Sequence, residues 1–98
     1  MIAHTVWFRL RHPRDSAEET AFLEDAFALS AIPGVIDFQR HHEVSPKNDF
    51  DFGFTMSFAD QAAYTSYDAH PVHVAFVEKR WKVEVEDFLE IDHVPLGA

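Results

Sequence analysis

Apolar and polar residues alternate one by one in four stretches of the chain, which is the spacing of a β-strand with one buried face. The most regular stretch, FDFGFTMSF, has phenylalanine or methionine at every second position. The alternation predicts strands over residues 2–10, 35–44, 50–58 and 83–92.

The strand over 35–44 is less regular than the first, and Asp87 interrupts the alternation of the last. The apolar side of the last strand is expected to consist of Val83, Val85, Leu89 and Ile91. Its carboxylates, expected on a solvated face, are Glu84, Glu86, Glu90 and Asp92.

Helix-start signals occupy the segments between the strands. SAEE at 16–19 is a capping box, which predicts that a helix begins there. Asp60 can cap a short helix that runs through Tyr67. Proline is favoured at the first helical position, so Pro71 is expected to restart the helix, which then continues to about Lys82.

The predicted order is strand, helix, strand, strand, helix, strand, which is typical of an α+β ferredoxin-like fold. We expect a four-stranded antiparallel sheet with helices on one face, and a single domain over residues 1–98. An apolar pocket between sheet and helices is expected to be lined by Val6, Phe8, Phe54, Met56 and Phe76.

The other face of the sheet is predicted to carry Thr5, Trp7, Thr55 and Phe88 together with many carboxylates. This mixture is too apolar in places for bulk water and too polar for a core. An uncovered face of this kind usually meets a partner. A twofold homodimer, sheet against sheet, is the simplest expectation.

The charge balance narrows the choice of partners. The chain has 17 acidic and 8 basic residues, a net charge of −9, which argues against binding to nucleic acid or to an anionic membrane surface. It has no cysteine, which fits a reducing compartment. No leader or membrane-spanning apolar run is recognisable, so a cytoplasmic protein is expected.

The segment YDAHPVHVAF carries the most conspicuous candidate chemistry. His73 falls on one helical stripe with Phe76 and Trp81, which directs its imidazole inward. His4 faces inward from the first strand, so the two imidazoles could meet and act as a general acid–base pair, with the Tyr67 hydroxyl beside them. The alternative is structural: the histidines fix helix docking, and Tyr67 closes the broken helix with its ring.

No metal or cofactor is expected from the sequence. His70 and His73 are three residues apart, but His70 is expected at the helix cap, and no third ligand has a recognisable spacing. His41 and His42 point to opposite faces of a strand. Neither a phosphate-binding loop nor a nucleophile elbow is present.

The motifs HTVWFRL, IPGV, FDFGFTMSF and YDAHPVHVAF, in this order, resemble the stress-responsive A/B barrel (Dabb) domain family. The resemblance covers about residues 2–92 and implies a ferredoxin-like subunit and a homodimer whose two sheets form an α+β barrel. It implies no single function.

One branch of that family, the plant polyketide (olivetolic acid) cyclases, closes linear polyketide thioesters without metal or cofactor. The resemblance to this branch implies that His73 is the base, that Tyr67 lies beside it and that His4 orients the substrate. A pocket tyrosine that the cyclases carry on their first helix has no counterpart here.

Three functions therefore stay open: a dimer that binds a small apolar or aromatic molecule, a cofactor-free cyclase or isomerase-like enzyme, and a structural or stress-protective dimer without a ligand.

Overall fold

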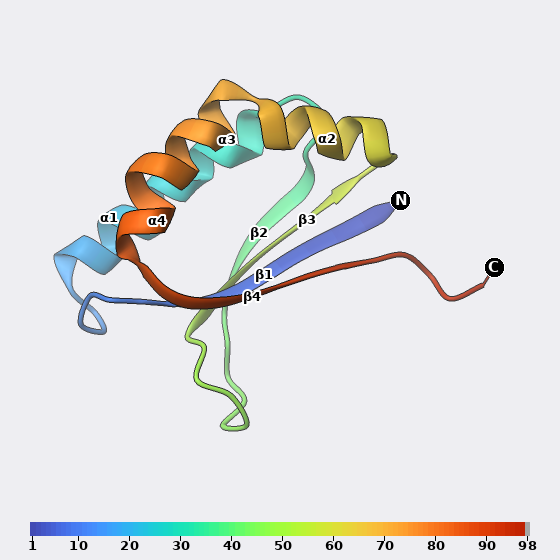
Figure 1. The fold of residues 1–98 in the computed structure, drawn as a ribbon. Helices are drawn as coiled ribbons and strands as arrows, with labels where there is room; N and C mark the ends of the chain where they lie inside the picture. Colours follow the sequence, from blue (N-terminus) through green and yellow to red (C-terminus); the bar gives the residue numbers. More distant parts are fainter. Residues whose placement is uncertain (98) are drawn as a thin grey trace.

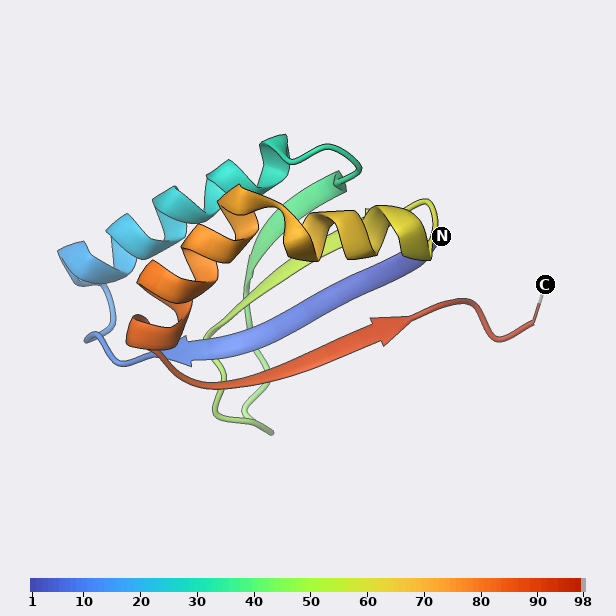
Figure 2. The same cartoon turned by 45° about the horizontal axis from the view of Figure 1, so that its top comes forward.

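A computed structural model describes residues 1–97 and contains a four-stranded antiparallel sheet in the order β2-β3-β1-β4 (Figure 1). The strands are β1 (Ile2–Leu10), β2 (Ile36–His42), β3 (Phe52–Phe58) and β4 (Val85–His93). All helices cover one face of the sheet, and the other face stays open (Figure 2). The predicted ferredoxin-like fold is confirmed.

The helical layer consists of two segments, each formed by consecutive helices. The first joins α1 (Ala17–Asp25) to a 3₁₀ segment, η1 (Ala26–Ala31). The second contains α2 (Gln61–Ala69), α3 (Pro71–Phe76), a π-helical turn η2 (Val77–Trp81) and α4 (Lys82–Glu84).

The predicted helix starts are confirmed by their hydrogen bonds. Ser16 Oγ accepts from the Glu19 N–H at 3.2 Å, and Asp60 Oδ1 accepts from the Ala63 N–H at 2.9 Å. At the break before Pro71, Nδ1 of His70 accepts from the Val72 N–H at 3.1 Å. This break turns the chain between α2 and α3, so that both segments lie over the sheet (Figure 2).

Alternate residues of β1 and β3 build the core, as the pattern predicts. The inward side chains of β3 are all buried: Phe52, Phe54, Met56 and Phe58. The ring of Phe8, on the neighbouring β1, is 4.7 Å from that of Phe54 and 5.8 Å from that of Phe22 in α1. Phe50, predicted to begin β3, precedes it.

The predicted faces of β4 are right at Val85, which is buried, and wrong for the rest of the strand. The pairing of β1 with β4 shifts between Arg9 and Leu10, and this irregularity inserts one extra residue into β4. A shift of one residue exchanges the two faces of a strand. Leu89 and Ile91 therefore lie on the open face, opposite Trp7 and Thr5.

Three side chains expected on the open or solvated side of β4 face the helices instead: Phe88, Glu90 and Asp92. Phe88 pairs with Phe8 and packs edge-on against Trp81 at 5.6 Å. Asp92 is the strand partner of His4 and lies on the same inward face. Val83, predicted to begin the strand, lies in α4 and is exposed.

Candidate functional site

A cavity of about 400 Å³ lies between the sheet and the second helical segment. Most of its walls are apolar, and they include four of the five side chains predicted for a pocket: Val6, Phe54, Met56 and Phe76. The fifth, Phe8, is not part of the lining, because it is fully buried beneath Phe22 and Trp81. Trp81 and Phe88 complete the aromatic wall.

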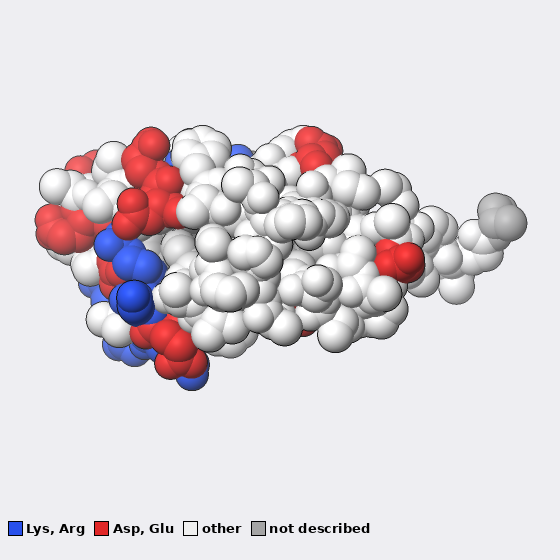
Figure 3. All heavy atoms as spheres, turned by 90° about the horizontal axis from the view of Figure 1, so that it is seen from above, with Lys and Arg blue, Asp and Glu red and all other residues white. Residues whose placement is uncertain are grey.

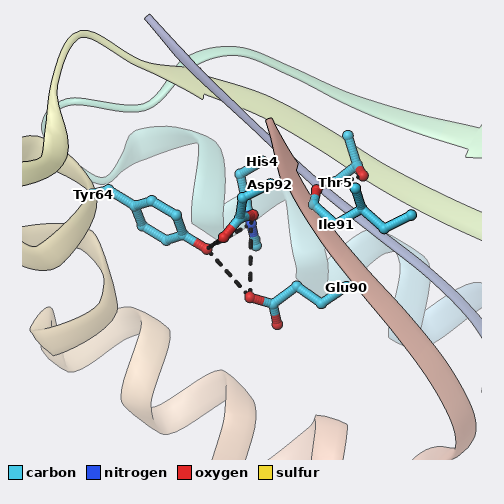
Figure 4. Close-up of polar contacts among 6 residues, drawn as sticks. All are labelled: His4, Thr5, Tyr64, Glu90, Ile91 and Asp92. Carbon is cyan, nitrogen blue, oxygen red and sulfur yellow. Dashed lines mark hydrogen bonds and ion pairs between the residues drawn. The ribbon is translucent and has the colours of Figure 1, made fainter. Parts of the chain in front are cut away.

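One end of the cavity is polar, and His4 is at its centre (Figure 4). The Nδ1 atom of His4 lies 2.6 Å from Asp92 Oδ1 and 2.8 Å from the hydroxyl of Tyr64. The same hydroxyl is 2.8 Å from Asp92 Oδ2 and 3.2 Å from Glu90 Oε1. Strand β1, strand β4 and helix α2 thus meet in one hydrogen-bonded cluster.

The partners of His4 determine where its proton lies. A neutral imidazole has one N–H, and a carboxylate can only accept. The proton is therefore on Nδ1, which donates to Asp92, while the Tyr64 hydroxyl donates to a carboxylate oxygen. Within residues 1–97, every polar contact of the His4 imidazole is made by Nδ1, so Nε2 keeps its lone pair.

Tyr64 and Tyr67 are both held in the phenol form. Burial raises the pKa of Tyr64 above its usual value, and the hydrogen bond to Asp92 and the charge of Glu90 raise it further. Burial, followed by the charges of Asp68 and Glu90, also raises the pKa of Tyr67. Both side chains are therefore hydrogen-bond donors at neutral pH.

His73 and Tyr67 form the second part of the polar end. Their rings are 4.5 Å apart, and both residues line the cavity. Nδ1 of His73 lies 2.9 Å from the carbonyl oxygen of Asp68, which can only accept, so this histidine also carries its proton on Nδ1 when neutral. Its Nε2 is then free to accept a proton or a hydrogen bond.

The three residues predicted for chemistry are thus brought to one cavity. His4 and Tyr67 are buried and His73 is half-buried. The rings of His4 and Tyr67 are 6.2 Å apart. His70 is the helix cap, as expected. The catalytic role of the three residues stays a prediction.

Sequence reasoning missed Tyr64, Glu90 and Asp92. Tyr64 could have been predicted from the sequence, since it precedes Tyr67 by three residues and so shares its helix face. The two carboxylates were not, because only the irregular pairing of β4 places them beside His4.

A metal could be held at the same place. One ligand atom each from His4, Glu90 and Asp92 lies within 4.8 Å of the others, which is close enough for a single ion. The three possible ligands come from β1 and β4, so no short spacing in the sequence indicates a metal site. An ion bound there would have to displace the proton on Nδ1 of His4.

Comparisons with known proteins agree with this architecture. The family model of the stress responsive A/B barrel domain (Dabb) matches residues 2–95. The chain therefore belongs to the Dabb family. No curated protein matches it. Among residues 1–97, no helix is both long and apolar enough to cross a membrane.

Solved structures share the fold over nearly the whole chain. A Dabb family protein with a ferredoxin-like fold from Mesorhizobium loti is 61% identical, with a TM-score of 0.97 and coverage of 98% of this chain and 97% of the other. A dimeric ferredoxin-like protein from Thermobifida fusca is 17% identical, with a TM-score of 0.79 and coverage of 96% and 90%. A hydroxynitrile lyase from Passiflora edulis is 13% identical, with a TM-score of 0.84 and coverage of 99% and 95%.

Proposed function

We propose that this Dabb protein binds a small molecule with an apolar or aromatic body in the cavity between sheet and helices. The observation that carries the proposal is the form of the cavity: a hollow of about 400 Å³ with aromatic walls and a few polar groups at one end. Small-molecule sites in proteins combine these features. The ligand's polar group would lie against His4, Tyr67 and His73.

Filling the cavity tests the proposal. Val77 lines it and Val74, in the same helical segment, is exposed outside it. Val77→Trp should abolish the binding of a neutral aryl alcohol such as 2-phenylethanol in a calorimetric titration, and Val74→Trp should leave it unchanged. Equal binding by the parent and Val77→Trp would show that the ligand lies elsewhere.

We further propose that the protein works as a homodimer through the open sheet face. Leu89 and Ile91 are about half exposed there, and a hollow of about 340 Å³ lies between Trp7, Leu89 and Phe50. Trp7 covers Gly53 on the neighbouring strand so closely that a Cβ at Gly53 would collide with the indole. The dimeric protein of the same fold from Thermobifida fusca supports self-association.

Acid–base catalysis without a cofactor is the second candidate, favoured by the free Nε2 atoms of both histidines. His73 would take a proton from a carbon next to a carbonyl, and the C–H electron pair would become the enolate. The Tyr67 hydroxyl would donate to the enolate oxygen, which is the stabilisation that a carbon acid needs. Neutral His4 has no N–H on Nε2, so it could donate to that oxygen only as the imidazolium that Asp92 would stabilise.

The hydroxynitrile lyase from Passiflora edulis shares the fold, which shows that an enzyme can be built on it. The test is turnover of β-dicarbonyl compounds and linear polyketide thioesters by the purified protein. Activity that His73→Ala retains in full would exclude His73 as the base.

A further inference from the structure

The polar end of the cavity is rich in hydrogen-bond acceptors. Nε2 of His4 and Nε2 of His73 both carry lone pairs, because both neutral rings hold their proton on Nδ1. The Glu90 carboxylate also lines the cavity and can only accept. Two phenol hydroxyls are the neutral donors here. That of Tyr64 is already bonded to the carboxylates of Asp92 and Glu90, and that of Tyr67 has no hydrogen bond within residues 1–97.

The charges around the cavity, like its hydrogen-bond acceptors, favour a ligand that is a donor or a cation. Glu90 and Asp68 line it, and Asp92 lies directly behind His4. The only lysine or arginine of its lining within residues 1–97 is Lys82, whose ammonium group is 2.7 Å from Glu78. Lys and Arg side chains of the helical face gather at the end where α1 begins and α4 ends, and most of that face is uncharged (Figure 3). The polar end of the cavity therefore has a negative potential.

An anionic ligand would meet acceptors and like charge at this end, and burying it there would be costly. A protonated amine has three N–H donors and no acceptor, which complements Glu90 and the two imidazole lone pairs. The apolar body of such a ligand would lie along Trp81 and Phe88, whose ring faces also attract a nearby cation.

We infer that the cavity selects an aromatic or alkyl amine bound as the ammonium ion, with Glu90 as its counter-ion. The inference rests on the proposed ligand-binding function and specifies its ligand class.

Three ligands of nearly the same shape test this selectivity: 2-phenylethylamine, 2-phenylethanol and 3-phenylpropanoate. Titrated calorimetrically at pH 7.5 into the full chain, the amine should bind about tenfold or more tightly than the alcohol, which corresponds to one charge-assisted hydrogen bond. The carboxylate should bind most weakly of the three.

The counter-ion is tested by Glu90→Gln, which keeps the shape and removes the charge. This variant should bind the amine about tenfold more weakly and the alcohol with unchanged affinity. Glu18→Gln, at an exposed position on α1, is the control for net charge and should leave all three ligands as they were. If Glu90→Gln weakens amine and alcohol alike, Asp68→Asn takes its place, with the same expectation of a loss confined to the amine.

The outcomes separate the two levels of the proposal. Equal binding of amine and alcohol, or preferred binding of the carboxylate, would overturn the amine while the ligand-binding function stands. Glu90 and its neighbours would be overturned as the counter-ion if Glu18→Gln lost as much amine binding as Glu90→Gln. The same would follow if Asp68→Asn, used in place of Glu90→Gln, left amine binding unchanged. Failure of all three ligands to bind would overturn the amine and the proposed function together.

Discussion

The carboxylate of Asp92 holds the imidazole of His4 through a 2.6 Å contact between Oδ1 and Nδ1, although 88 positions separate the two residues. The contact joins the inner strand β1 to its neighbour β4 at the edge of the sheet. It fixes the tautomer of His4 and so leaves Nε2 as an acceptor. In the proposed ligand site, this orientation of His4 would favour a ligand that donates a hydrogen bond to Nε2.

Loss of His4 should cost more stability than loss of His73. His4→Ala leaves the buried Tyr64 hydroxyl and Asp92 without a shared partner, so we expect a loss of about 1–3 kcal/mol in the free energy of unfolding. His73 is half-buried and bonds to one backbone carbonyl, so His73→Ala should cost about 1 kcal/mol or less.

Denaturant unfolding of the two variants measures this difference. A loss in His73→Ala as large as that in His4→Ala, with no ligand effect in the parent, would favour the structural role of His73 instead.

The raised pKa of Tyr64 predicts a loss of stability in alkali. The folded state keeps the phenol protonated above the pH at which the unfolded chain, with a tyrosine pKa of about 10, releases its proton. Stability is therefore fully present below about pH 10 and falls as the pH rises toward the folded pKa, by up to about 1.4 kcal/mol per pH unit for each such group.

Tyr64→Phe removes this titration, so between pH 9 and 11 its stability should fall less steeply than that of the parent. The comparison is made by urea unfolding at a series of pH values. Thr65→Ala, at an exposed position in the same helix, is the control and should keep the slope of the parent. Equal slopes for the parent and Tyr64→Phe would contradict the buried, carboxylate-bonded phenol.

A charge on the open face should break the dimer. Ile91→Lys places an ammonium group opposite Thr5 at the proposed interface, where removing it from water would cost free energy. Sedimentation velocity should show the parent as a dimer and this variant as a monomer of about 11.3 kDa.

Val83→Lys is the matched control, because Val83 is exposed in α4, away from the open face. It should sediment as the parent does. A monomeric parent at micromolar concentration would overturn the dimer, and a dimeric Ile91→Lys would overturn the sheet-to-sheet geometry.

If the protein is an enzyme, its proton transfer should not depend on metal. The Nδ1 atom of His4, which a metal would need, is already bonded to Asp92 and Tyr64. We expect EDTA to leave the turnover of a carbon acid unchanged and His73→Ala to lower it about 100-fold or more. Activity lost on chelation and restored by a divalent ion would reassign His4, Glu90 and Asp92 as metal ligands.

The sequence was sufficient for the fold, because each element carries a local signal. Residues 50–58 alternate, Ser16 and Asp60 cap helices, and Pro71 restarts one. The inward directions of His4 and His73 follow from the same periodicities, and both residues line the cavity.

The sequence was not sufficient for the carboxylate half of the site. A one-residue irregularity in the pairing beside Leu10 exchanges the faces of β4, and the periodicity of β4 alone gives no sign of it. Phe88 was therefore assigned to the open face, and Glu90 and Asp92 to solvent. Only the long-range pairing with β1 brings them to His4.

The proposed binding mode requires His4 and His73 to present free Nε2 atoms to a ligand in the cavity. Long-range ¹H–¹⁵N correlation spectra of the imidazole rings measure this directly, at a pH where both rings are neutral. We expect both histidines as the Nδ1–H tautomer, and both Nε2 resonances to shift when 2-phenylethylamine is added, while those of His41 and His42, outside the cavity, stay fixed. The proposed binding mode would be contradicted if His4 and His73 were found as the Nε2–H tautomer. It would also be contradicted if their Nε2 resonances did not shift when the ligand binds.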